Sequence, residues 1–452
     1  MKTFQDLQAI GANEKERMAF VLSAVQDHQE SELYKTARDA ELYYRHQNPT
    51  IMRAQKLVYD LAGRAHVDVW TANHKIPSRL YFYFVTQAVQ FLLGNGISFG
   101  DKETGDALGK GFDSVVQKIA TAAKNGGVAF GFWNVDHLEA FSVQEFAPLW
   151  DEETGALRSG IRFWQLSEEK PLRATLFEED GYTEYIRKDS EDMTVYMEKR
   201  PYIQIVETSE AGGENIADGE NYPGFPIVPL WNINRQSELV GSRETLDAYD
   251  LMSSALVNSI DDANLIYWVI RNAGGMDDID DLKFVQRLKT MHVVHLEGEE
   301  QVDRHQVEAP FEASDAALER LRSQLFDDFM ALDVKNIASG ATTATQIKAA
   351  YEPLNSVTDL FEYQVTDFIL GILALVGIDD APTYTRSVMI NQQETIDNLV
   401  SAAEYLSDEY LTTKVLEVLG DADKVDEVLA QIVRRDAGRF EEADETEETE
   451  EI

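Results

Sequence analysis

The sequence of 452 residues contains no cysteine. Disulfide bonds and cysteine-ligated zinc sites are therefore excluded, which fits a reducing compartment. We also expect no signal peptide, because residues 1–17 are polar and have no apolar core before a small-residue cleavage site. The most apolar helical run, Phe368–Ile378, is too short to span a bilayer. We therefore expect a soluble intracellular protein without membrane contact.

Basic residues are scarce, with 40 Lys and Arg against 81 Asp and Glu, so the net charge is −41. Proteins that bind nucleic acid by neutralising phosphates need clustered Lys and Arg, so this composition disfavours general affinity for DNA. Acidity by itself indicates solubility or adaptation to a salty cytoplasm. It is also compatible with a channel whose wall repels phosphate and lets a duplex slide.

Motifs for catalysis are incomplete. Gly96–Gly100 matches the G-x-S-x-G nucleophile elbow, which needs a strand before the serine and a helix after it. Here a helical pattern precedes the motif and Asp101–Gly105 is predicted to be a loop, so a glycine-bounded turn is favoured. Gly105–Gly111 fails the phosphate-loop pattern, because only three residues precede its Gly-Lys pair. The enzymatic alternative is a serine hydrolase using Ser98 with a histidine such as His137.

Metal-binding patterns are equally weak, and we predict neither a metal site nor a cofactor. His292 and His295 would face opposite sides of a strand, which disfavours a chelate with the nearby His305. The acidic run at 277–281 lacks the spacing of a calcium loop. It is better interpreted as a solvated face or as a contact surface for a partner, formed by Asp277, Asp278, Asp280 and Asp281.

The first half of the chain changes from helical to β patterning. Apolar residues at helical spacing predict helices at Lys15–His28, Glu30–Tyr44, Ser78–Leu93 and Phe112–Ala123. Short aromatic and β-branched runs then predict a mostly antiparallel region, with Glu210–Glu220 as a polar loop. The runs are Val128–Val135, Ala140–Gln144, Gly160–Leu166, Ala174–Phe177, Tyr182–Arg187, Met193–Met197 and Tyr202–Thr208.

Two long helices are predicted next, at Ser242–Arg271 and Ala313–Val334, separated by a polar, strand-like insert. Asp261 and Asp262 lie off the apolar stripe of the first helix. The members of the stripe recur every three or four residues: Leu246, Tyr249, Met252, Leu256, Ile260, Ala263 and Tyr267.

A small-residue loop at Lys335–Thr343 follows, and then a helix that the T-x-x-Q pattern at Thr343 can cap. Pro353 is predicted to kink or break that helix, because it removes a donor and clashes with the preceding turn. Residues 392–436 are expected to form two or three further helices. The tail Glu441–Ile452 is nearly all acidic and is expected to be disordered.

This order of elements resembles that of the portal proteins of tailed bacteriophages, the siphovirus-type head-to-tail connectors. Local segments over residues 30–380 resemble the family too: Ser78–Phe99, Lys124–Asp136, Gln144–Asp151, Gly224–Asn234, Asp247–Ile270 and Ser339-Gly340 with the following helix. The resemblance implies an α+β portal fold. Its parts are a mixed α/β wing (1–240), stem helices (241–271 and 311–334), a small α/β clip (272–310), a tunnel loop with a kinked helix (335–378), a helical crown (379–440) and an acidic tail (441–452).

The resemblance also implies a function. Portals form a ring, of twelve subunits in the virion, at one capsid vertex, and are assembled in the host cytoplasm. A terminase drives double-stranded DNA through the ring during packaging, and the DNA later leaves by the same channel. Implied partners are other copies of the chain, the terminase large subunit, the major capsid and scaffolding proteins, and a head-completion or adaptor protein.

Residue roles follow from the same resemblance. The stem interface would comprise Leu246, Tyr249, Met252, Leu256, Ile260 and Tyr267, and the clip surface would be the acidic run at 277–281. The channel loop would comprise Lys335, Asn336, Ser339, Gly340, Thr342, Thr343 and Lys348. Besides the hydrolase, the remaining alternative is an acidic helical interaction scaffold with no role in DNA handling.

Overall fold

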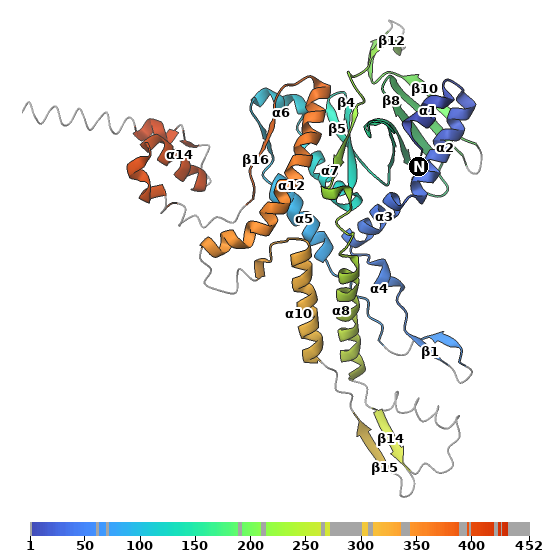
Figure 1. The fold of residues 1–452 in the computed structure, drawn as a ribbon, viewed down its shortest axis with the longest axis vertical. Helices are drawn as coiled ribbons and strands as arrows, with labels where there is room; N and C mark the ends of the chain where they lie inside the picture. The colour runs from blue at the N-terminus through green and yellow to red at the C-terminus, as the bar shows by residue number, and fades with distance from the viewer. Residues whose placement is uncertain are drawn as a thin grey trace, which may run out of the picture. The chain divides into compact units, whose positions relative to one another are not determined.

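A computed structural model describes residues 2–59, 63–68, 72–188, 192–208, 214–263, 267–271, 301–305, 311–335, 344–387, 396, 399–419, 424–425 and 427–432. These residues form two compact units, which are described separately. The first unit comprises residues 1–332 and 353–385, and the second comprises residues 333–352 and 386–452. In the first unit, helices and two antiparallel sheets form a body from which two long helices project (Figure 1).

The predicted N-terminal helices are present, and their ends follow local capping. Ser31 accepts a hydrogen bond from Tyr34 N–H at the start of α3, and Gly127 ends α7 with a φ of 81°. The predicted loop at 101–105 is wrong, because Asp101 caps a short helix, α6. The helices are α1 Phe4–Ile10, α2 Glu14–Glu30, α3 Glu32–Tyr44, α4 Pro49–Arg53, α5 Leu80–Leu93, α6 Lys102–Leu108 and α7 Phe112–Gly126.

Two larger antiparallel sheets follow. One has the order β10-β9-β8-β7-β6 and the other has the order β13-β4-β5. The strands are β4 Val128–Asn134, β5 His137–Ser142, β6 Phe146–Trp150, β7 Leu157–Trp164, β8 Leu172–Glu178, β9 Gly181–Arg187, β10 Thr194–Arg200 and β13 Ile227–Trp231. Strand β13 was not predicted, and β6 lies in Gln144–Asp151, which the family resemblance alone indicated as a strand of the wing. Pro229 is tolerated in β13 because that strand lies at a sheet edge.

Four smaller sheets have two strands each in the described part of the chain. They pair β1 Leu57–Tyr59 with β2 Ala65–Val67, β3 Ile97–Phe99 with β16 Pro382–Tyr384, β11 Ile203–Thr208 with β12 Glu214–Glu220, and β14 Tyr267–Arg271 with β15 Gln301–His305. The polar loop predicted at 210–220 is wrong in its second part, since residues 214–220 form β12. Pairing with β11 overrides the polar composition there.

The three-stranded sheet is packed on both faces. Phe130 packs with Phe146 between the two sheets, at a ring-centroid distance of 4.6 Å. The other face is covered by α7 and by α12 (Ala344–Val376), through residues that include Ile119 and Phe368. A Cβ at Gly131 would lie 2.5 Å from the Phe368 ring, so glycine permits this close approach.

The long helices are α8 Arg243–Ala263 and α10 Phe311–Asp328, which lie side by side (Figure 1). The predicted helix Ser242–Arg271 is therefore too long. Residues 267–271, YWVIR, are aromatic and β-branched and form strand β14, so Tyr267 is not on the helix. The second helix was also predicted too long, because it ends at Asp328 in place of Val334.

Helix α12 contains Pro353 without being broken there, so of the predicted alternatives a break is wrong. In the second unit, a 3-10 turn at Ala403–Tyr405 precedes α14, Asp408–Leu419. A short 3-10 turn of the first unit, Ile233–Arg235, lies between β13 and α8. The part of the strand-like insert that contains His292 and His295 lies outside the described residues, and so does the acidic tail. Within the described residues, every helix is too short or too polar to cross a bilayer.

Candidate functional site

One face of α8 is polar and buried. Asp250, Ser254 and Asn258 are each less than 10% exposed and lie four residues apart. They accept hydrogen bonds from backbone N–H groups of an extended segment: Ser78 to Asp250 Oδ1 (2.9 Å), Ile76 to Ser254 Oγ (3.0 Å) and His74 to Asn258 Oδ1 (2.7 Å). We call this set the ladder.

The ladder depends on a match between two periodicities. Four helical residues rise about 6 Å, and two extended residues rise about 6.6 Å. Alternate N–H groups of the extended segment therefore meet every fourth residue of α8, with the two chains running in opposite directions. A further contact lies near the C-terminal end of α8, where His74 Nε2 is 2.6 Å from Asp261 Oδ2. The D-x₃-S-x₃-N spacing of Asp250, Ser254 and Asn258 could have predicted a polar face of this helix. The prediction of this helix rested on the apolar stripe alone.

Two carboxylates, those of Asp247 and Asp250, hold the N-terminal part of α8 in place. Asp247 accepts hydrogen bonds from Tyr43 Oη (2.5 Å) and Thr50 Oγ1 (2.8 Å), and Asn48 Nδ2 donates to both Asp247 (3.0 Å) and Asp250 (2.8 Å). Burial raises the pKa of Asp250. Burial, together with the hydrogen bond to Asp247, raises the pKa of Tyr43 to about 12. The start of α8 is thus held to α3 and α4 by these neutral donors and by the ion pair between Arg243 and Asp39 of α3 (3.0 Å).

The apolar face of α8 is divided between core and surface. Leu246 is 1% exposed and packs among aromatic residues of α5 and α10, with Tyr249 partly buried at the edge of the same cluster. Further along, a groove of about 390 Å³ runs beside α10. We call it the stem groove, and it is lined by Ala248, Leu251, Met252, Ala255, Leu256, Ser259 and Ser314.

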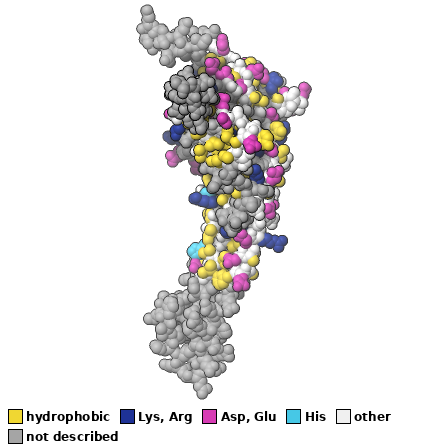
Figure 2. All heavy atoms as spheres, turned by 90° about the vertical axis from the view of Figure 1, so that its left-hand side faces the viewer, with side chains coloured by type: hydrophobic (Ala, Val, Ile, Leu, Met, Phe, Trp, Pro, Cys, Tyr) yellow, Lys and Arg dark blue, Asp and Glu magenta, His cyan; other side chains and the backbone are white. Residues whose placement is uncertain are grey.

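The exposed side chains of this region are unusually apolar for a free surface. Leu251 and Ile260 are 42% and 44% exposed. Figure 2 shows hydrophobic side chains in patches on one side of the molecule, interspersed with acidic ones. Exposed apolar patches of this kind mark interaction surfaces. Of the predicted interface residues, Met252 and Leu256 line the stem groove and Ile260 is exposed; their role in an interface stays a prediction.

The predicted channel residues are described only in part. Lys335 is exposed, and its backbone N–H donates to Asp333 Oδ1 at 3.1 Å. Lys348 is an exposed residue of α12. Asn336, Ser339, Gly340, Thr342 and Thr343 lie outside the described residues, as do the acidic residues at 277–281 and both His292 and His295.

Ser98 does not have the geometry of a nucleophile elbow. It lies in the middle of β3, opposite Thr383, whose hydroxyl donates to the Ser98 carbonyl at 3.1 Å. An elbow would place the serine on the turn between strand and helix. In this protein that turn is occupied by Gly100 and Asp101, whose N–H groups donate to the carboxylate of Asp380 (both 3.1 Å).

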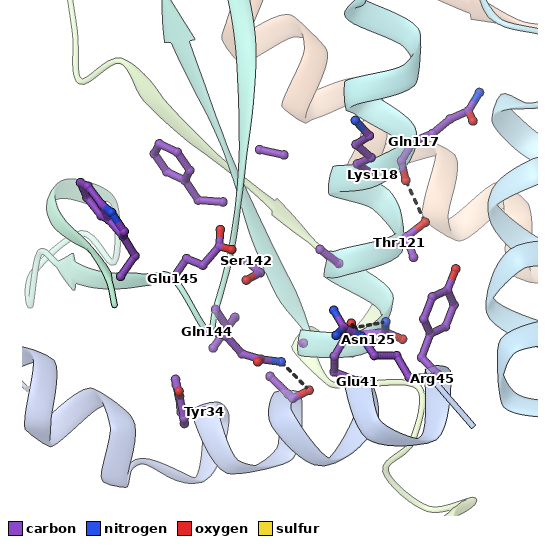
Figure 3. Close-up of a pocket in the computed structure, with 18 of the residues that line it drawn as sticks. Tyr34, Glu41, Arg45, Gln117, Lys118, Thr121, Asn125, Ser142, Gln144 and Glu145 are labelled. Carbon is purple, nitrogen blue, oxygen red and sulfur yellow. Dashed lines mark hydrogen bonds and ion pairs between the residues drawn. The ribbon is translucent and has the colours of Figure 1, made fainter. Parts of the chain in front are cut away.

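A cavity of about 1050 Å³ forms an open trough in the body of the first unit (Figure 3). Polar side chains of α7, including Lys118 and Thr121, form one wall, and β5 and α3 form others. Asn125 donates to Glu41 at 3.4 Å, while its Oδ1 is buried without a hydrogen-bond partner. The lining is mixed in charge, and two of its residues, Glu41 and Arg45, form an ion pair at 2.6 Å at the end of α3. Within the described residues, no cluster of three or more His, Asp or Glu could hold a metal ion.

Comparison with known proteins gives one decisive match. The family description "Phage portal protein, SPP1 Gp6-like" matches residues 23–438. The chain belongs to this family. The family resemblance predicted from the sequence is thereby confirmed, and so is the mixed α/β class of the portal fold.

Portal proteins of two phages are similar to this family member along most of its length. The portal protein of Clostridium phage phiCD119 is 26% identical over 354 residues, which cover 70% of this chain and 73% of that protein. The portal protein of Bacillus phage SPP1 is 22% identical over 409 residues, covering 83% and 78%. A chain from the virion of a native gene transfer agent particle is 13% identical with a TM-score of 0.39, covering 75% of this chain and 89% of its own.

Proposed function

We propose that this portal-family chain forms a ring-shaped channel at a capsid vertex, through which double-stranded DNA is packaged and later ejected. Family membership over residues 23–438 supports a portal role in a phage capsid. The observation that carries the ring is the stem groove, because it leaves apolar side chains of α8 exposed in the single chain. Portals are structural proteins, and no catalytic step is assigned to this one.

In the proposed ring, α8 and α10 run along the channel as stem helices and contact the stems of neighbouring copies. A ring requires a heterologous interface, in which two different surfaces of one subunit meet. Met252, Leu256 and Ile260 belong to one of these surfaces. The strand pair β14–β15 at the far end of the stem would then belong to the clip, which we propose as the contact for terminase and, later, the adaptor protein.

The test of the ring is assembly of the purified protein, imaged as single particles. Leu256→Glu places a charge in the stem groove and is expected to abolish rings while leaving the monomer folded. Ala316→Glu is the matched control, because Ala316 is an exposed residue of α10 about 200° around the helix from Ser314. A wild-type chain that stays monomeric at high concentration and moderate salt would refute the proposal.

For the segment at 335–343 we propose contact with the DNA. Its neutral residues, flanked by Lys335 and Lys348, would touch phosphates without holding them. Replacing Gly340 by a bulky residue is then expected to leave rings intact and to reduce the number of DNA-filled heads. Normal filling would remove this segment from the mechanism. The other proposed partners, the capsid and scaffolding proteins, follow from the family alone.

A further inference from the structure

The two-stranded hairpin β1–β2 of the first unit has exposed apolar side chains. The arm is the segment 53–75, of which the structure describes residues 53–59, 63–68 and 72–75. It follows α4 in the sequence, and its last residues, from His74 on, belong to the ladder. The two strands of the arm share only three residue pairs, Leu57–Val67 to Tyr59–Ala65. All of Ala65–Val67 is exposed, and Leu57 and Val67 are 49% and 48% exposed.

Such a hairpin is not stable by itself in water. Two isolated strands need a third strand or an apolar surface to pack against. In Figure 1 the arm projects from the side of α8 that faces away from α10. In the described part of the chain, Leu57 and Val67 keep about half of their surface exposed. A surface outside the subunit could cover the remainder of both side chains.

The stem groove has the complementary properties. It is apolar, narrow and bordered by small residues, among them Ala248, Ala255 and Ser314, so a protruding side chain can enter it. The two elements also differ in their overall charge. The arm carries four basic and two acidic residues in a chain of net charge −41, whereas α8 and α10 together carry ten acidic and three basic residues.

The arm and the stem groove lie at the same height along the axis of α8. The arm begins just after α4, where Thr50 is bonded to Asp247, and it ends at His74, which is bonded to Asn258 and Asp261. It thus projects from the part of α8 between residues 247 and 261. The stem groove extends from 248 to 259. Rotation about an axis parallel to α8 keeps the level of every atom, so an arm that reaches the neighbouring subunit would meet it at the level of the groove.

We propose that the arm of each subunit docks in the stem groove of the adjacent copy of this chain. This inference rests on the ring proposed above, with α8 running along the channel. Leu57 and Val67 supply the apolar contact, and the basic residues of the arm lie against an acidic stem. The ring would then be fastened by exchanged arms as well as by helix contacts.

The absence of cysteine makes cross-linking a direct test. Val67→Cys protein is mixed with Ala255→Cys protein before assembly and treated with a short bismaleimide, so that a mixed cross-link forms only between copies. We expect covalent dimers from this mixture and none from either variant alone. Mixing Val67→Cys with Ala316→Cys is the control, and it should give no dimers.

The outcomes separate this proposal from the ring itself, which is imaged in the same samples. Arm docking is overturned if rings form without a cross-link between positions 67 and 255, or if position 67 cross-links equally to position 316. The proposed ring itself is unaffected by either result. Absence of rings in wild-type protein overturns the ring and the docking together.

A second test measures the energetic role of the arm. Replacing both Leu57 and Val67 by Ser is expected to lower the fraction of protein in rings without lowering the monomer melting temperature, because both side chains are exposed in the monomer. Leu166→Ser is the control, since Leu166 is 85% exposed and lies outside the arm. An unchanged ring fraction in the double variant would overturn the proposal.

Discussion

The ladder makes a quantitative prediction at Asp250, a residue that is 2% exposed. Replacing it by Ala leaves two buried donors, Ser78 N–H and one N–H of Asn48, without acceptors. Each such donor costs about 1–3 kcal/mol. Removing a buried charge returns part of this cost, so we expect a net loss of about 2–3 kcal/mol in the free energy of unfolding.

Asp250→Asn keeps the shape but supplies only one acceptor. The amide nitrogen of the new Asn side chain would face either Ser78 N–H or Asn48 Nδ2, both of which are donors. The Asn48 amide cannot flip to offer its oxygen, because Asn48 Oδ1 already accepts from Thr50 N–H (2.9 Å) and Ile51 N–H (3.4 Å). We therefore expect about half of the loss caused by Ala, roughly 1–1.5 kcal/mol. The control Asp367→Asn changes an exposed residue of α12 and should alter stability by less than about 0.5 kcal/mol.

Urea unfolding, followed by circular dichroism on the same assembly form of each variant, measures these values. The pH dependence adds a second check. Burial raises the folded-state pKa of Asp250 above its ordinary value of 3.8, so the folded state binds this proton more readily. The advantage of wild type over Asp250→Asn should then grow as the pH falls through the raised pKa, and level off below 3.8. A variant Asp250→Asn as stable as wild type would refute the ladder as a stabilising contact.

Three further predictions concern the body of the first unit. Lys124→Met removes the ammonium group that now lies 2.9 Å from Glu238, and it should lower the free energy of unfolding by about 3 kcal/mol. The double variant with Glu238→Gln should recover most of this loss, and urea unfolding measures both. Asp380 has its pKa lowered to about 2 by hydrogen bonds, so its contribution should be lost as the pH falls from 3.8 to about 2, and acid unfolding of Asp380→Asn should lack this step. In thermal unfolding, Gly131→Ala should destabilise by about 1–3 kcal/mol, whereas Gly105→Ala, with open space around it, should stabilise by about 0.5–1 kcal/mol.

Local pattern accounts for most of the elements that were predicted correctly. Helices such as Phe112–Gly126 have apolar residues at helical spacing and a glycine at the end, so nearby residues determine them. Most β strands between 128 and 208 follow from aromatic and β-branched runs between polar turns. The errors at 214–220 and 267–271 share one cause, because each segment is a strand only through its partner.

The sequence by itself determined the order of the elements, the two long helices and the family resemblance, because periodicity and composition are local properties. The tertiary structure alone decided which part of the α8 stripe is surface: Leu246 is buried by α5 and α10, while Met252 and Leu256 line an open groove. It likewise decided that Ser98 pairs with a strand near residue 383. Burial and long-range pairing depend on residues hundreds of positions away, which no local pattern contains.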